Sequence, residues 1–257
     1  MVKDKIRQIG VILATVVMLV NNVLASAIPY NGVTTMEASK SISIYFIPAS
    51  YAFSIWGLIY MGLLAYTVYQ ALPSQKENDI LRKIGWWYVA GIGAFSTWMV
   101  FFHFQVYLIA TVMMICLLIS LVVIYTKLGT GITQVSCGMR YLVQVPFSLF
   151  LGWVTMSTIG NLANLLQYFD WKGLGIDAKN WAVVMMVVTI VIAELTAFNR
   201  QDLAYLAVFV WSFIGIAVNN SGVTPVFEAA CVSAAIVIII TVITLIMRPK
   251  KSSENYA

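Results

Sequence analysis

Long apolar runs separated by short polar segments make up almost the whole chain. A helix that crosses a membrane needs roughly 20 consecutive apolar residues, so this pattern predicts a bundle of about eight transmembrane helices. The seventh run is the shortest, at about 16 residues, and is the weakest of the eight. The runs cover residues 9–28, 53–72, 86–104, 106–126, 141–166, 181–198, 203–218 and 226–247.

A transmembrane β-barrel would need segments of roughly ten residues that alternate apolar and polar positions. Runs such as 107–125 are apolar without interruption, which favours helices. Composition supports this, because 61% of the residues are hydrophobic, 10% are charged and the mean hydropathy is +0.90. Soluble domains carry about 25% charged residues. We therefore expect an all-α polytopic membrane protein and exclude a soluble enzyme, a nucleic-acid-binding protein and a disordered chain.

The basic residues predict the orientation of the helices. If the N-terminus lies inside, 12 of the 15 Lys and Arg residues fall in inner segments, and only Lys40, Lys172 and Lys179 fall in outer loops. Basic loops stay on the cytoplasmic side of a membrane. The sequence thus predicts both termini in the cytoplasm, in the plasma (inner) membrane of a bacterium. The distribution of basic residues across the membrane therefore explains the net charge of +5, and nucleic acid is not expected as a partner.

The first apolar run has an alternative interpretation as a cleaved signal peptide. Lys3, Lys5 and Arg7 form a basic start, and Ala-Ser-Ala at 25–27 resembles a cleavage site. A run of about 20 residues is longer than the 7–15 residues of a signal-peptide core, which favours a retained helix. The intact mass of the purified protein distinguishes a cleaved signal peptide from a retained helix, because cleavage would leave a chain beginning at Ile28. Such a chain would have seven spans.

Ionisable side chains are scarce inside the predicted spans. His103, Glu194 and Glu228 all lie near span ends, whereas proton-coupled pumps place such groups at mid-depth. No lysine lies in a span to form a Schiff base. Nucleotide-binding, zinc-protease and serine-hydrolase motifs do not occur. We expect no catalytic residues and no enzyme activity.

The three cysteines are Cys116, Cys137 and Cys231. They are scattered, without the spacing of a metal site or of a covalent cofactor. Packing explains them, and we expect neither a bound metal nor a cofactor.

Amide and aromatic side chains are the remaining candidate binding groups. Asn161 and Asn164 lie three residues apart and so share one helix face. Amides in spans satisfy each other across helices or face a ligand cavity, and from the residues alone interhelical hydrogen bonding is preferred. The same holds for the aromatic residues, where packing is preferred to a pocket. The amides are Asn21, Asn22, Gln144, Asn161 and Asn164, and the inner aromatics are Trp56, Tyr60, Trp98 and Trp153.

Residues 48–60 read Pro-Ala-Ser-Tyr-Ala-Phe-Ser-Ile-Trp-Gly-Leu-Ile-Tyr. This segment resembles the entry to helix two of the tryptophan-rich sensory protein family, TspO/MBR, whose relatives include the translocator protein. The family has a Pro-Pro-x-Trp segment followed by W-x-x-L-Y. Trp56 to Tyr60 is similar to the second element, while Ala49 and Tyr51 replace the second proline and the tryptophan of the first.

Two further motifs carry the resemblance. Trp98 matches a tryptophan of helix three, although Phe95 stands where the family usually has an asparagine. Trp153, followed by valine and then by Asn161, is similar to the helix-five pattern. The resemblance covers about residues 9–168, and the last three runs lie outside it.

The resemblance implies a five-helix membrane domain, 1–168, followed by three additional transmembrane helices and a short cytoplasmic tail, 169–257. It also implies a ligand cavity open to the outer loop 29–52, whose second half either lies flat on the membrane face or folds over the bundle as a lid. Members of the family bind tetrapyrroles such as protoporphyrin, and some bind cholesterol. By position, Trp56, Tyr60, Trp98, Trp153 and Asn161 would line the pocket, with Tyr51 and Phe53 at the lid.

Three functions remain open from the sequence. The first is a membrane receptor or carrier for a hydrophobic, tetrapyrrole-like ring ligand, held by aromatic stacking and amide hydrogen bonds. The second is a small-solute secondary transporter, for which no inverted repeat is evident. The third is a non-catalytic scaffold that docks another membrane protein through small-residue seams. Expected partners are the lipid bilayer, a hydrophobic small molecule and, as a candidate, a second copy of the chain.

Overall fold

The computed structural model describes residues 2–28, 30–33 and 44–247, and the described chain is helical with no strand. The all-α membrane fold is confirmed, since seven helices are long and apolar enough to span a membrane. α9, with 17 residues, is a shorter apolar helix, whereas α3, also of 17 residues, forms a 22-residue span together with the preceding turn, Ser50–Ala71. The long helices are α1 (Val2–Ala27), α3 (Ile55–Ala71), α4 (Asp79–His103), α5 (Tyr107–Leu128), α7 (Val145–Tyr168), α8 (Ala178–Arg200), α9 (Leu203–Asn219) and α10 (Val226–Met247).

Short helical turns connect these helices. Two of them bear on the site and its helices, namely the turn that precedes α3 and the turn that precedes α7. The short turns are η1 (Tyr30–Gly32), η2 (Ser50–Ser54), η3 (Pro73–Gln75), α6 (Cys137–Met139), η4 (Arg140–Gln144) and η5 (Gly173–Gly175). The predicted tail, the central part of the 29–52 loop and Lys40 lie outside the described residues.

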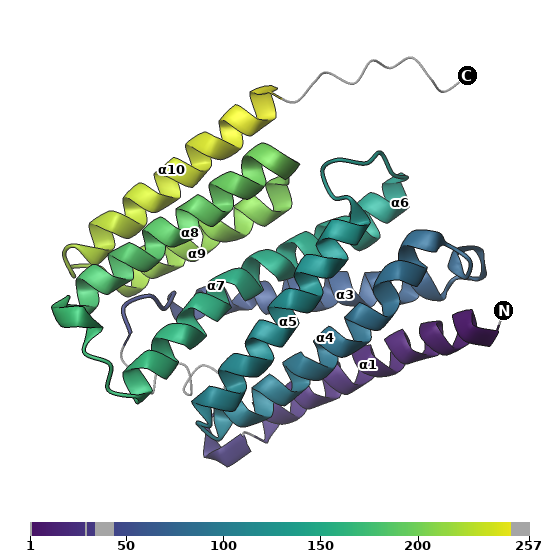
Figure 1. Ribbon diagram of the computed structural model, residues 1–257, viewed down its shortest axis with the longest axis horizontal. Coiled ribbons are helices and arrows are strands. Elements are labelled where there is room, and N and C mark those ends of the chain that lie inside the picture. Colours follow the sequence, from purple (N-terminus) through teal and green to yellow (C-terminus); the bar gives the residue numbers. More distant parts are fainter. Residues whose placement is uncertain (1, 29, 34–43, 248–257) are drawn as a thin grey trace.

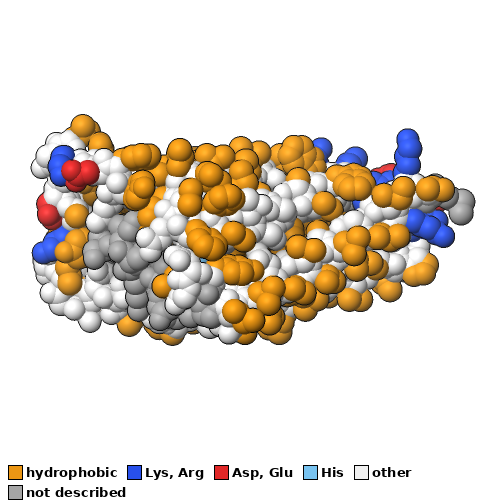
Figure 2. Space-filling model, turned by 90° about the horizontal axis from the view of Figure 1, so that it is seen from below, with side chains coloured by type: hydrophobic (Ala, Val, Ile, Leu, Met, Phe, Trp, Pro, Cys, Tyr) orange, Lys and Arg blue, Asp and Glu red, His pale blue; other side chains and the backbone are white. Residues whose placement is uncertain are grey.

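The long helices run side by side as one bundle (Figure 1). Hydrophobic side chains cover the middle of the face in Figure 2, and charged side chains gather at its two ends. α1 begins and α10 ends at the same end of the bundle (Figure 1), as an even number of passes requires. α9 lies alongside its neighbours although, at 1.5 Å per residue, it is only about 25 Å long.

Helix ends follow local sequence chemistry. Asn78 accepts hydrogen bonds from the first backbone N–H groups of α4, and Asp202 does the same for α9. α5 ends at Gly129, whose φ of 59° suits the left-handed conformation that glycine tolerates. A π-helical turn, η4, precedes α7, where Pro146 supplies no N–H to the helix ladder. The wider turn accommodates that missing bond.

Helix packing joins the last three helices to the first five. α8, α9 and α10 pack on one another, and α9 packs on α7. A Cβ on Gly152 of α7 would lie 3.0 Å from Val208 Cβ of α9, so the two backbones approach closely there. The two predicted segments, 1–168 and 169–257, thus form one continuous bundle, and the boundary between them stays a prediction.

Candidate functional site

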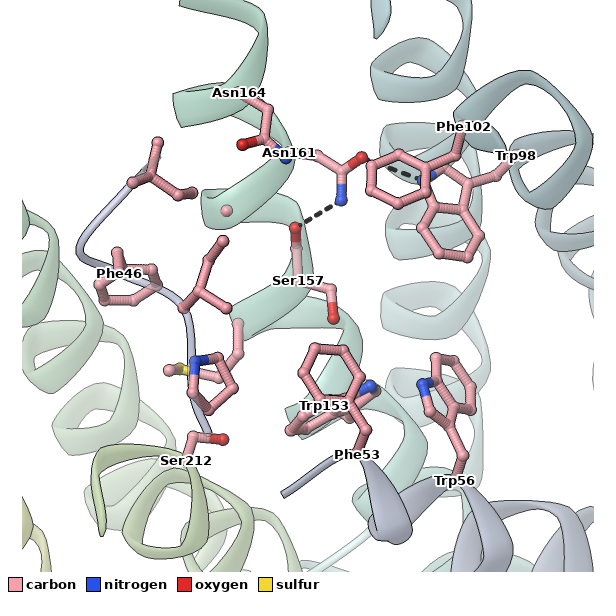
Figure 3. Close-up of a pocket in the computed structure, with 15 residues that line it drawn as sticks. Phe46, Phe53, Trp56, Trp98, Phe102, Trp153, Ser157, Asn161, Asn164 and Ser212 are labelled. Atoms are coloured by element: carbon pink, nitrogen blue, oxygen red, sulfur yellow. Dashed lines mark hydrogen bonds between the residues drawn. The ribbon is translucent and has the colours of Figure 1, made fainter. Parts of the chain in front are cut away.

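A cavity of about 80 Å³ lies between α4, α7, α9 and the segment 44–53, which precedes α3 (Figure 3). Its walls are mostly apolar and aromatic. The lining residues are Ile44, Phe46, Ile47, Pro48, Phe53, Trp56, Trp98, Phe102, Trp153, Met156, Ser157, Gly160, Asn161, Asn164 and Ser212.

A column of five aromatic rings forms one side of the site. Trp56 stacks on Tyr60 with ring centroids 5.4 Å apart, and the next ring along the column is Phe95, at 5.0 Å from Trp56. Phe95 stacks on Trp98 at 5.7 Å, and Trp98 stacks on Phe102 at 5.0 Å. Phe95 is only 1% exposed, so the residue that replaces the expected asparagine completes the column behind the cavity wall. Offset ring stacking of this kind adds to the energy of simple burial.

Trp153 of α7 faces this column from the opposite wall. Its ring makes edge-to-face contacts with Phe53, at 5.7 Å between centroids, and with Trp56, at 6.3 Å. The three rings come from η2, α3 and α7, and they close the inner end of the cavity (Figure 3). A planar apolar ligand entering here would meet ring faces and edges on several sides.

Asn161 is already hydrogen-bonded within the protein. Its Oδ1 accepts from Trp98 Nε1 at 3.0 Å, and its Nδ2 donates to the Ser157 carbonyl at 2.8 Å (Figure 3). Its own carbonyl accepts from Thr111 Oγ1 at 3.4 Å. The amide therefore holds Trp98 in place, tying α4 to α7.

Two other polar atoms in the cavity wall have no partner among the described residues. They are Asn164 Oδ1, on a residue 4% exposed, and Ser212 Oγ, on a residue 0% exposed. An unpaired polar atom buried in an apolar site costs free energy, which a partner restores. A ligand carrying an N–H or O–H group would supply that partner.

The segment over the cavity, residues 44–52, is hydrogen-bonded to α9; we call it the cover. Ala49 N donates to the Gly215 carbonyl at 2.8 Å, and Trp211 Nε1 donates to the Ala52 carbonyl at 2.9 Å. The side-chain amides of Asn219 and Asn220 also donate to cover carbonyls. The cover therefore belongs with the additional helices as much as with the first five.

The structure brings together five of the seven predicted site residues, Phe53, Trp56, Trp98, Trp153 and Asn161. The other two lie outside the cavity wall. Tyr60 stacks behind Trp56, and Tyr51 turns away to contact the Trp211 ring and is 42% exposed.

Sequence reasoning left several wall residues out of the predicted site. The sequence could have indicated Asn164 as a site residue, since it shares a helix face with Asn161. Phe46, Phe102 and Ser212 had no such signal in the sequence, because they come from a loop, from the turn after Trp98 and from a helix outside the family motifs. Across the described ranges, no group of three His, Cys, Asp or Glu side chains is placed to hold a metal.

Comparison with known proteins gives one match. A family model described as TSPO-like protein matches residues 8–244, from within α1 to near the end of α10. The match therefore takes in α8, α9 and most of α10 as well as the first five long helices, which the resemblance covers. No curated protein and no solved structure matches the chain.

Proposed function

Because the chain belongs to the TSPO-like protein family, and its helices form a membrane bundle with an aromatic-rich interior, we propose that it is a receptor or carrier for a hydrophobic ring ligand. The ligand class favoured by the family resemblance is a tetrapyrrole. Sensing and transport are both compatible with such a site.

The observation that carries the proposal is the combination of the ring column with two unpartnered polar atoms in one mostly apolar cavity. Ligand pockets are mostly apolar, with a few placed polar groups that fix orientation. Asn164 Oδ1 and Ser212 Oγ supply those groups here. The cavity, at about 80 Å³, is below the roughly 300–1,000 Å³ usual for ligand pockets, so binding requires side chains in its wall to move.

Protoporphyrin added to the purified protein in detergent should quench tryptophan fluorescence saturably. Trp153→Phe should raise the Kd by roughly two- to twelvefold, because stacking differences are worth about 0.5–1.5 kcal/mol. Trp86→Phe is the matched control, since Trp86 is 54% exposed on α4 and lies outside the cavity. Equal effects of both substitutions, or no saturable quenching by any porphyrin, would remove the proposal.

We also propose that both termini face the cytoplasm of a bacterial inner membrane. Lys3, Lys5, Arg82 and Lys83 lie in the parts of α1 and α4 at the end of the bundle where the chain begins, as the positive-inside rule requires of the cytoplasmic end. The loop between α7 and α8, with Lys172, lies at the other end.

A membrane-impermeant maleimide tests this orientation. Cys137 is exposed before η4, so in a Cys116→Ser, Cys231→Ser background we expect labelling in inside-out vesicles only. Lys172→Cys in a cysteine-free background should label in right-side-out vesicles only. The reverse pattern would invert the proposed topology.

A further inference from the structure

A second cavity, of about 270 Å³, lies next to the first, between the end of α7, the 171–176 loop and α8. It shares Ile44 and Phe46 with the first cavity, and these two cover residues form the wall between them. Phe46 is only 3% exposed. Other residues lining the second cavity include Ala163, Gln167, Trp171, Ala178, Trp181 and Met185.

The backbone on each side of Phe46 is held by α9. Asn220 Nδ2 donates to the Tyr45 carbonyl at 3.0 Å, and Asn219 Nδ2 donates to the Ile47 carbonyl at 3.1 Å. Lifting the cover would break these bonds, each worth about 0.5–1.5 kcal/mol. No side-chain hydrogen bond restrains the phenyl ring of Phe46, so turning it costs packing alone. The easiest opening between the cavities is therefore a rotation of this side chain.

Resting on the function proposed above, we propose that the two cavities are the inner and outer halves of one ligand chamber, with Phe46 as the side chain that divides them. Their volumes, about 80 and about 270 Å³, come together to about 350 Å³. That value reaches the range usual for pockets that hold small-molecule ligands, which the inner cavity alone does not. Phe46 thus limits the size of the ring ligand and its rate of entry.

The chamber has a polarity gradient that defines the ligand class. Its inner half ends in the tryptophan and phenylalanine rings, and its outer half carries Gln167 and Lys172 and ends at the exposed loop that joins α7 to α8. Trp171 and Trp181, with ring centroids 4.9 Å apart, lie at this outer end, as aromatic residues do at membrane interfaces. The fitting ligand is amphipathic, with a mainly apolar ring body directed inward, an N–H or O–H on that body for the inner polar atoms, and a polar substituent left at the interface.

Stopped-flow tryptophan quenching with two probes of different size tests the chamber. The probes are 1-aminoanthracene, which is small, and protoporphyrin, which is large. Phe46→Ala should speed association of protoporphyrin at least tenfold and change that of 1-aminoanthracene less than threefold. Phe46→Trp should slow protoporphyrin by a similar factor. These opposite effects follow because only the larger ring needs the partition to move.

A second experiment blocks the outer half of the chamber. It uses substitutions at exposed residues, whose replacement leaves the core intact. Ala178 is exposed and lines the second cavity, so Ala178→Trp should slow protoporphyrin entry at least fivefold. Leu174→Trp is the matched control, since Leu174 is 81% exposed in the adjoining loop and outside the cavity. It should leave the rate unchanged.

The outcomes separate this inference from the function on which it rests. Saturable quenching with rates that neither Phe46 nor Ala178 variants alter would overturn the shared chamber and leave the proposed function standing. Absence of saturable quenching in the natural chain and in Phe46→Ala, with both probes, would overturn both. Faster protoporphyrin association in Phe46→Ala, together with slower association in Ala178→Trp, would support the shared chamber.

Discussion

Leucine in place of Gly215 is expected to weaken ring-ligand binding at least tenfold. A Cβ at this position would lie 2.8 Å from Pro48 Cβ and 3.0 Å from Ala52 Cβ, closer than such atoms pack. The Gly215 carbonyl also accepts the hydrogen bond from Ala49 N that fixes the cover. A leucine side chain must therefore push the cover off α9 and remove one wall of the cavity.

The size of that effect follows from the part of the site that is lost. The cover supplies Phe46, Ile47 and Pro48 to the cavity wall, and a tenfold change in Kd corresponds to about 1.4 kcal/mol. Overpacking itself costs roughly 1–3 kcal/mol of stability, so the bundle should still fold. We expect faster ligand dissociation in stopped-flow experiments together with a higher Kd.

Gly93→Leu is the control for a glycine in a helix of the same bundle. Nothing lies within 4 Å of a Cβ at Gly93, which is exposed on α4. The Kd of the Gly93→Leu variant for the ring ligand should match that of the natural chain. Unchanged binding in Gly215→Leu, at an unfolding temperature that shows a folded protein, would mean that the cover is not part of the site.

Asp202→Leu is expected to lower the free energy of unfolding of the bundle by about 3 kcal/mol. The Asp202 carboxylate is buried where α9 begins, at the junction with α5 and α7. Its Oδ2 accepts hydrogen bonds from Tyr125 Oη and Ser148 Oγ, and its Oδ1 accepts from the backbone N–H groups of Ala204 and Tyr205. Leucine would leave the buried Tyr125 hydroxyl without its acceptor, at about 1–3 kcal/mol, and would remove a helix cap worth about 1 kcal/mol. Ser148 Oγ would keep its other acceptor, the Gln144 carbonyl.

Thermal unfolding in detergent measures this loss. For a chain of this size each kcal/mol shifts Tm by roughly 2–4 °C, so we expect a fall of about 6–12 °C. Asp202→Asn keeps an oxygen acceptor for the helix cap, and the hydroxyls of Tyr125 and Ser148 can rotate to hydrogen-bond the amide. The fall in Tm of this variant should therefore be less than half of that in Asp202→Leu. Asp177→Leu is the matched control, because Asp177 caps α8 in an exposed position. A Tm loss in Asp202→Leu no larger than in Asp177→Leu would show that the junction contributes little.

The fold followed from the sequence because spanning helices are specified locally, by apolar length. All eight predicted runs coincide with long helices, including α9, whose 17 residues were the weakest case. The start of α1 was the main difference. The structure places it at Val2, since the basic first residues continue the helix beyond the apolar run that begins at residue 9.

The site followed from the sequence only in part, because it depends on contacts between distant segments. Trp56 and Tyr60 share a helix face, yet only Trp56 reaches the cavity. The two amides Asn161 and Asn164 also share a face. Trp98, from another helix, donates to Asn161 Oδ1, while Asn164 Oδ1 has no partner among the described residues, and this difference separates their roles. Nothing in the local sequence could show this.

The attachment of the cover to α9 could not be predicted from the sequence either. It joins irregular backbone to side chains more than 150 residues away, through Trp211, Asn219 and Asn220. Such bonds have no periodic pattern and lie outside the family motifs. They give the additional helices a role that the sequence left open, that of holding one wall of the cavity.

The most direct test of the central claim is an experimental structure of the protein with protoporphyrin bound. We predict ligand density between Trp98 and Trp153, beneath the cover, with a polar group of the ring system within hydrogen-bond distance of Asn164 Oδ1. Density found only on the open, apolar groove between α1 and α4, where Val16 and Thr97 lie, with the inner cavity unchanged, would contradict the account.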